Sequence, residues 1–404
     1  IIKMTAAKIR CTNDLKLSQV LLENPDIKRV IARIKRLEEK GEQPATRRQL
    51  LTTSVRLSRA MAAGLHAKAD HCVERLGIET PLELYAYASP QFNAACFKPE
   101  EGRVFIMFSS SLLEAFADQE LLFVMGHELG HHVYHHHEVP IGYVLRGRRP
   151  PPADLALDLF AWSRYAEISA DRAGAFCAED LDSVARALFK LASGITSENV
   201  VTFKLDEFLG QVDDMLAFDD KPGQGAPMQD WFSTHPFSPL QVKALTFFHE
   251  SSLMLASGDD KPALEDKVQQ LMNLMEPDYM QGKTDASRAM RDLFLAAAVV
   301  IADAHEGISD KERAALKSFL GKAYAVDALD SLRLREDLPR RVTEARERNS
   351  LTQRMQVMRD ICLIATTEKP VSDVELELLS EIATGLEVPG SFVTQCLDAP
   401  VELD

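Results

Sequence analysis

Apolar residues recur at helical spacing over most of the 404-residue chain. This spacing predicts helices over residues 25–41, 46–77, 154–192, 199–217, 240–256 and 263–275. Two stretches rich in aromatic and branched side chains, LELYAYA at 82–88 and RVFIMF at 103–108, predict strands separated by a KPEEGR turn. The fold class expected from this pattern is mainly α with a small β-sheet.

Two helix starts follow the second strand. Ser111-Leu-Leu-Glu114 fits a capping box that opens a short helix. Asp118 is then expected to cap a second helix that contains MGHELGHHVYHHH, residues 125–137, and that ends before Pro140. Residues 219–239 are dense in Gly and Pro and predict a loop, either a flap over a cleft or a long surface loop.

The last part of the chain contains an internal similarity. IADAHEGISDKERAALKSFLG starts at Ile301 and IATTEKPVSDVELELLSEIATG starts at Ile364, an offset of 63 residues. Each copy predicts an apolar helix, a polar turn, a Ser cap and a second amphipathic helix. We therefore expect one domain over residues 1–282 and an all-α C-terminal domain with a duplicated helical hairpin over residues 283–404.

Composition narrows the class of protein. The net charge of −15 argues against a nucleic-acid partner, which would require a basic face. The six cysteines form no CxxC pair, which indicates buried thiols rather than a disulfide framework. The longest apolar run, FLAAAVVIA at 294–302, is about half the ~18 residues of a membrane span. The N-terminal residues lack the pattern of a secretion signal, so we expect no transmembrane segment and a cytoplasmic location.

Six of the eleven histidines fall within residues 125–137. His127 and His131 are spaced i and i+4, so on a helix both can reach one Zn²⁺. Glu128 lies beside the first of them and can take a proton from a metal-bound water as it attacks a carbonyl. The pattern HExxH alone also occurs by chance on polar helix faces, and a catalytic zinc requires a third protein ligand.

Two residues compete for that third position. His137 stands where HExxHxxGxxH enzymes have their last ligand, but Tyr134 replaces the glycine that their turn requires. Glu167, in AEISADRAG at 166–174, is the favoured alternative. Asp171 follows Glu167 by four residues and can accept a hydrogen bond from the second ring nitrogen of a ligand histidine.

HELGHH, EISADRAG and then STHPFSP at 233–239 together resemble the zinc metallopeptidase family that includes HtpX, BepA and the CAAX prenyl protease. The resemblance covers about residues 25–255 and implies a zincin-type metallopeptidase domain with one Zn²⁺. It implies His127, His131 and Glu167 as ligands, Glu128 as general base, Asp171 behind a ligand, and His235 near the metal.

The resemblance has two departures. Gln241-Val242-Lys243 stands where relatives commonly have an acidic-Arg pair, which leaves the anchoring of the Thr-His-Pro turn open. Many relatives also have membrane-spanning helices around the catalytic segments, whereas residues 140–153 are short and polar here. RVFIMF is either an edge strand that pairs with the substrate backbone or an ordinary buried strand.

The other four histidines, His132, His135, His136 and His137, point in different directions on a helix. We expect them to be solvated residues at the helix end without a chemical role, with a secondary metal-binding patch as the alternative. From Met290, MRDLFLAAAVVIADAHEGISDKERAALKSFL resembles the TerB-like helical domain of tellurite-resistance proteins.

The sequence therefore predicts a soluble zinc metalloendopeptidase that cleaves protein or peptide substrates. The C-terminal domain is expected to regulate it, for example by keeping it latent, or to recruit a protein partner. The alternative from another class is a catalytically silent, zinc-containing binding or chaperone-like protein.

Overall fold

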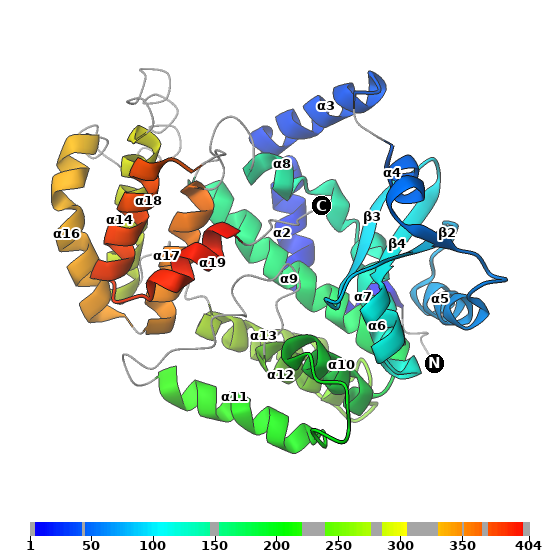
Figure 1. Cartoon of the computed structure of the whole chain (residues 1–404). Coiled ribbons are helices and arrows are strands. Elements are labelled where there is room, and N and C mark those ends of the chain that lie inside the picture. The colour runs from blue at the N-terminus through cyan, green and yellow to red at the C-terminus, as the bar shows by residue number, and fades with distance from the viewer. Residues whose placement is uncertain are drawn as a thin grey trace.

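The computed structural model of the chain is mainly helical with one small sheet, so the predicted fold class is confirmed (Figure 1). The structure describes residues 5–42, 45–145, 153–219, 239–275, 285–304, 330–349, 351–365 and 371–398. The sheet with its helices lies at one end of the molecule and the C-terminal helices lie at the other, with a long central helix between them (Figure 1).

The sheet has four strands in the order β1-β2-β4-β3. The strands are β1 (Val55–Leu57), β2 (Leu82–Tyr87), β3 (Ala94–Glu100) and β4 (Arg103–Ser109). β2 and β4 are parallel neighbours, whereas β1 and β3 run antiparallel at the two edges. The predicted strands at 82–88 and 103–108 are thus present, and both lie in the interior of the sheet.

Two predictions about this region were wrong. β1 interrupts the helix predicted over residues 46–77, which is instead divided into α4 (Thr46–Thr53) and α5 (Ala63–Leu76). KPEEGR is not all turn, because β3 continues to Glu100 and a tight turn through Glu101 and Gly102, both with positive φ, leads into β4. Pro99 is tolerated in β3 because an edge strand has one side without a ladder partner.

The helix starts after β4 also differ from the prediction. α6 (Ser110–Ala115) is capped by Ser109, whose hydroxyl accepts from the Leu112 N–H, so the predicted cap at Ser111 was two residues too late. α7 (Asp118–Val133) begins with Asp118 as its first helical residue rather than as its cap. The Glu120 carboxylate accepts a hydrogen bond from the backbone N–H of Ala117 at 2.9 Å. This N–H, at the start of the helix, therefore has a hydrogen-bond acceptor.

α7 packs closely against α9 (Ala153–Ala178), the long helix in the centre of Figure 1. Glycines permit the close approach. A Cβ at Gly130 would lie 2.9 Å from the Ala173 Cβ, and one at Gly174 would lie 2.5 Å from the Phe123 carbonyl oxygen. The surrounding core is apolar and includes residues from α5, the sheet and both central helices. This pairing fixes how side chains of α7 and α9 face each other.

The N-terminal helices are anchored on the same central pair. α1 (Ala6–Ile9) and α2 (Thr12–Glu23) pack against α9. The Tyr134 hydroxyl donates to the Ala6 carbonyl at 2.8 Å, and the Cys11 N–H donates to the Ser169 hydroxyl at 3.0 Å. α3 (Pro25–Glu39) follows and contacts α2 and α8 (Ile141–Leu145). Residues 5–23 therefore belong structurally to the unit that contains HExxH.

Four further helices complete this unit: α10 (Leu181–Ser193), α11 (Leu205–Asp219), α12 (Pro239–Glu250) and α13 (Lys261–Met275). Arg172 of α9 makes a buried two-point ion pair with Glu265 of α13, with nitrogen–oxygen distances of 2.9 and 3.1 Å. Glu265 also accepts from the Thr12 N–H at 3.1 Å. One carboxylate thus ties α13 to α9 and α2.

The C-terminal helices have a core of their own, formed by apolar residues between Met290 and Cys396. These helices are α14 (Asp285–Asp303), α16 (Ser331–Arg348), α17 (Leu351–Ala365), α18 (Asp373–Gly385) and α19 (Gly390–Asp398). In the second copy of the predicted hairpin the described residues form α17 and α18, and Ser372 with Glu375 forms a capping box at the start of α18. Most of the first copy lies outside the described residues, and the boundary at 282/283 stays a prediction.

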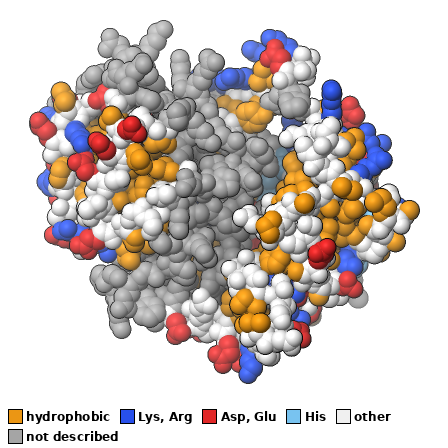
Figure 2. Space-filling model, in the orientation of Figure 1, with side chains coloured by type: hydrophobic (Ala, Val, Ile, Leu, Met, Phe, Trp, Pro, Cys, Tyr) orange, Lys and Arg blue, Asp and Glu red, His pale blue; other side chains and the backbone are white. Residues whose placement is uncertain are grey.

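Surface composition differs between the two ends. Hydrophobic side chains gather over the sheet side of the molecule, where Leu51, Val55 and Met61 are exposed, whereas charges of both signs are interspersed over the C-terminal helices (Figure 2). Among the described residues, no helix is both long and apolar enough to cross a bilayer.

Candidate metal centre

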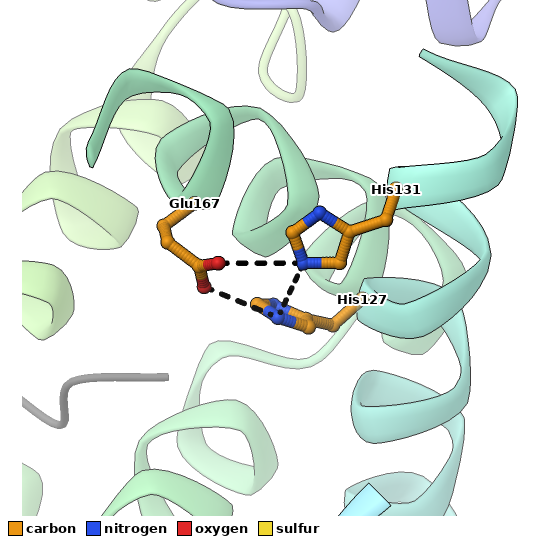
Figure 3. Close-up of side chains that lie close together, drawn as sticks. All are labelled: His127, His131 and Glu167. Atoms are coloured by element: carbon orange, nitrogen blue, oxygen red, sulfur yellow. Dashed lines mark hydrogen bonds and ion pairs between the residues drawn. The ribbon is translucent and has the colours of Figure 1, made fainter. Parts of the chain in front are cut away.

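α7 and α9 bring three potential ligand side chains together (Figure 3). The His127 Nε2 lies 3.3 Å from the His131 Nε2, because residues four apart share a helix face. The Glu167 carboxylate of α9 faces both rings, with Oε2 at 3.4 Å from the His127 Nε2 and Oε1 at 3.4 Å from the His131 Nε2. Of the two candidates for the third ligand, Glu167 therefore lies in this cluster and His137 does not.

The separations fit a small tetrahedral metal ion. Ligand atoms about 2.0–2.1 Å from a tetrahedral Zn²⁺ lie about 3.3–3.4 Å from one another. The two Nε2 atoms are 3.3 Å apart, and each lies 3.4 Å from a different oxygen of the Glu167 carboxylate. Two imidazoles and one carboxylate also form a donor set that leaves a fourth position open, as in catalytic zinc sites. The residues present thus fit the metal in donor type and proximity, with one ligand atom from each within 4.8 Å of the others.

Asp171 forms a hydrogen bond with the ring nitrogen of His127 that faces away from the other candidate ligands. The His127 Nδ1–H donates to the Asp171 Oδ1 at 2.9 Å, which leaves Nε2 to face the metal position. Burial raises the pKa of Asp171 despite the hydrogen bonds it accepts. Burial lowers the pKa of His127, but the hydrogen bonds and charges of Asp171 and Glu167 outweigh it, and the pKa is raised well above its ordinary value.

Gln241 connects the start of α12 to the candidate metal centre, whereas the Thr-His-Pro turn before it lies outside the described residues. Its side-chain Nε2 donates to the Asp171 Oδ2 at 2.9 Å, and both groups are buried. The departure from the acidic-Arg pattern therefore still provides a contact between the start of α12 and the residue that orients His127.

Glu128 is the fourth site residue, and it is buried beside the edge strand β3. Its Oε2 accepts a hydrogen bond from the Cys96 N–H at 2.9 Å. Because successive backbone groups of a strand alternate in direction, this N–H points away from β4, toward the edge of the sheet. Of the two interpretations of RVFIMF, the ordinary buried strand is the correct one: β4 has a neighbour on each side, and the strand beside Glu128 is β3.

The expectation that the other four histidines are solvated was wrong for His136, which is buried, and for His132 and His137, which are partly buried. α7 ends at Val133, and His135 adopts a left-handed conformation with φ 57°, which turns the chain back toward the helix. His136 is consequently buried, and its Nδ1 lies 2.8 Å from the Nδ1 of His131. Burial also lowers the pKa of His137 to about 4, whereas His135 is exposed as expected.

The second ring nitrogen of His136 contacts the carboxylate of Asp14. The His136 Nε2 lies 3.1 Å from the Asp14 Oδ2, and Asp14 itself is fully buried in the first turn of α2. The motif search missed Asp14 and His136. The sequence gave no signal for Asp14, because an acidic residue in the first turn of a helix is common and is usually solvated. His235 lies outside the described residues, so its predicted place near the metal stays a prediction.

Comparison with known proteins agrees with this geometry. Residues 59–146 and 153–247 match the model of Peptidase family M48. Over 155 residues the chain is 34% identical to the plastoglobule-localized metallopeptidase 48, chloroplastic, of Arabidopsis thaliana. That alignment covers 36% of this chain and 44% of the relative, so the chain spans less than half the length of this curated protein. No solved structure matches the chain.

Proposed function

We propose that this protein is a zinc-dependent endopeptidase that hydrolyses peptide bonds of protein substrates. The observation that supports it best is the cluster of His127, His131 and Glu167, whose ligand atoms lie within 4.8 Å of one another, with Glu128 beside it. The M48 match indicates a metallopeptidase, and zinc is the metal that a two-imidazole, one-carboxylate donor set suits. Each chain would hold one zinc ion.

Each nearby residue has a definite task under this proposal. A bound zinc would polarise the substrate carbonyl and lower the pKa of a water molecule. Glu128 would take the proton of the attacking water on its carboxylate and pass it to the leaving amine. His127, His131 and Glu167 would hold the ion, and Asp171 would orient His127. His235 would donate a hydrogen bond to the oxyanion.

The edge strand β3 is the proposed binding surface for the substrate backbone. An extended peptide can add to a sheet edge through main-chain hydrogen bonds, with its side chains entering pockets on either side. The Cys96 N–H, which now bonds Glu128, points out of this edge. A substrate strand lying there would run directly past the general base.

The test is to measure bound zinc and then compare cleavage of an unfolded protein by the wild type and by Glu128→Gln. Loss of a general base should lower the rate about 10²–10⁴-fold while zinc content stays unchanged. The His127→Ala, His131→Ala double variant should lose the metal. Stoichiometric zinc in that double variant would place the site elsewhere, and equal cleavage by Glu128→Gln would remove Glu128 from the mechanism.

The second candidate function is a catalytically silent binding or chaperone-like protein that retains the zinc for shape. Glu128 argues against it, because a carboxylate buried next to the three candidate ligands lies where a general base is required. Substrate protection without cleavage in the experiment above would favour this second function.

The remaining proposals concern the C-terminal part and the location. We propose that residues 283–404 form a TerB-like helical domain that controls the peptidase or recruits a protein partner. Its last residues, from Val371 onward, include eight acidic side chains and no Lys or Arg, which suits a basic partner. A cytoplasmic location stays a prediction, since the Arabidopsis relative is named as chloroplastic and plastoglobule-localized.

A further inference from the structure

The two candidate ligand histidines differ in the residue that their Nδ1 atoms contact. His127 uses Asp171, which belongs to the motif on α9. His131 instead contacts His136, at 2.8 Å between the two Nδ1 atoms, and His136 contacts Asp14, at 3.1 Å between Nε2 and Oδ2. His131 is therefore connected through the imidazole of His136 to the carboxylate of Asp14 on α2.

The protons in this chain have a single consistent arrangement when a metal is bound. The His131 Nε2 faces the metal and must present its lone pair, so the ring proton lies on Nδ1. That Nδ1–H donates to the His136 Nδ1, which must then be unprotonated. His136 carries its proton on Nε2 and donates it to the Asp14 carboxylate. Each hydrogen bond fixes the tautomer of the ring before it.

The carboxylate at the end of this chain is held rigidly. Asp14 is fully buried and accepts hydrogen bonds from the Arg10 Nε at 2.7 Å, the Trp162 Nε1 at 3.1 Å and the Ser169 hydroxyl at 2.8 Å. Such a set of donors from α9 and from the residue before α2 stabilises an ionised carboxylate away from water. Asp14 can thus serve as a fixed acceptor for His136.

The backbone conformation of His135 determines where the His136 ring lies. His136 reaches His131 only because His135 adopts a left-handed conformation, which is unfavourable for a residue other than glycine. The ring of His136 then packs edge-on against Trp162, with centroids 5.7 Å apart. Local strain that delivers one ring to a ligand is typical of a functional arrangement rather than of a solvated helix end.

We propose that His136 and Asp14 are positioning residues for His131, and that helix α2 is therefore part of the metal centre. The proposal rests on the proposed zinc site, and it extends that site beyond the region that matches the M48 family, which begins at residue 59. Residues behind a metal ligand typically change metal affinity 10–100-fold when they are replaced.

The test compares two substitutions of one residue in the full-length chain. His136→Gln keeps a side-chain acceptor for the His131 N–H, whereas His136→Met has similar length and no strong acceptor. We expect zinc affinity, measured by competition with a chromophoric chelator, to fall roughly 10–100-fold in His136→Met and much less in His136→Gln. The absorption spectrum of bound Co²⁺ should change in the same order, because it reports the ligand geometry. Val20→Ala, at a position of α2 that is 61% exposed, is the control and should bind zinc like the wild type.

Equal zinc affinity in His136→Met and the wild type would overturn the proposal, and so would an equal loss in both His136 variants. If His136→Met does not fold, Asp14→Asn carries the same test, because it retains the His136 ring and replaces its charged acceptor by a neutral one. Thermal unfolding of this variant records the effect on the Arg10, Trp162 and Ser169 contacts. An unchanged zinc affinity in Asp14→Asn would overturn the proposal too. A wild-type chain that binds no zinc would instead contradict the proposed function. The two failures are therefore distinguishable.

Discussion

The Asp171 carboxylate, which orients His127, has a second donor in Gln241. Both Asp171 oxygens are engaged, Oδ1 by the His127 ring and Oδ2 by the Gln241 amide at 2.9 Å. Burial raises the pKa of this carboxyl group, so each donor matters for keeping it ionised and in place. Gln241 provides this contact without a charge, where many relatives use a charged pair.

Replacing Gln241 by Leu should destabilise the fold by about 1–3 kcal/mol, because the buried Oδ2 of Asp171 loses a hydrogen-bond donor. Urea unfolding of the full-length chain measures this free energy. Lys243→Met, on the same helix but partly exposed, is the control and should change stability by less than about 0.5 kcal/mol. A similar small effect of Gln241→Leu would show that the amide contact contributes little.

The histidine-rich stretch shows what residue patterns can and cannot predict. His127 and His131 were predictable because their i, i+4 spacing has one geometric meaning on a helix. His136 was not, because its position depends on the end of α7 at Val133 and on the positive φ of His135. Histidine at a left-handed position is uncommon and gives no signal in the sequence, so helical spacing was extended too far.

At the scale of elements, the contact between α7 and α9 determines whether the three ligands meet. Gly130 lies on α7 between the two histidines and faces Ala170 and Ala173 of α9. A Cβ there would lie 2.9 Å from the Ala173 Cβ and 3.0 Å from the Ala170 Cα, which is closer than such atoms approach. The small residue in HELGH thus sets the distance between the histidines and Glu167.

Gly130→Ala should therefore force the helices apart, destabilise the fold by about 1–3 kcal/mol and weaken zinc binding. Gly64→Ala is the control, since Gly64 lies in α5 with open space around it, and alanine there should stabilise the chain by about 0.4–1 kcal/mol. Thermal unfolding and chelator competition measure the two effects. Wild-type zinc affinity in Gly130→Ala would show that α7 and α9 can move apart at this position without disturbing the metal ligands.

The ion pair of Arg172 and Glu265 joins three elements and gives a pH-dependent prediction. Burial alone would raise the pKa of Glu265, but the hydrogen bonds and charge of Arg172 outweigh it and the pKa is lowered. A lowered folded-state pKa contributes stability above the ordinary value of 4.5, and this contribution is lost as the pH falls through the folded value. Arg172 is almost fully buried, so loss of its partner leaves an uncompensated charge.

Glu265→Gln should therefore destabilise the chain by roughly 3 kcal/mol at neutral pH. The difference from the wild type should shrink once the pH falls below 4.5, because the wild-type carboxylate then takes up a proton and loses the same interaction. Urea unfolding of both proteins at neutral pH and at several pH values below 4.5 measures this. A difference that stays constant through that range would show that the pair is not the source of the effect.

Sequence patterns predicted the interior strands of the sheet and missed both edge strands. β2 and β4 are rich in buried aromatic and branched residues, which is the pattern that identifies strands. β1 has only three residues next to a short helix, and β3 contains Lys98, Pro99 and Glu100, which are typical of turns and edges. The edge strand next to Glu128, which the proposed mechanism uses, was thus the one with the weakest signal.

At the scale of the whole molecule, the described apolar residues form separate clusters. The largest spans residues from Ala6 to Met272 and surrounds the candidate metal centre, and the second lies between Met290 and Cys396. α13 and α17 are in contact between these two parts. Every residue assigned to metal binding or proton transfer lies in the first part, and the M48 match also ends there, at residue 247.

Removal of residues 284–404 should accordingly leave a folded, zinc-loaded protein, because it takes away a separate core and none of the ligands. The proposed regulatory role adds a second expectation, that the truncated protein cleaves at a changed rate or with a changed choice of substrate. Zinc content, thermal unfolding and cleavage of an unfolded protein should be measured for the truncated and full-length chains. Unchanged cleavage of generic and native substrates would argue against regulation. Aggregation or loss of zinc would show that α17 and its neighbours support the catalytic fold through α13, and the proposed boundary at 282/283 would then be wrong.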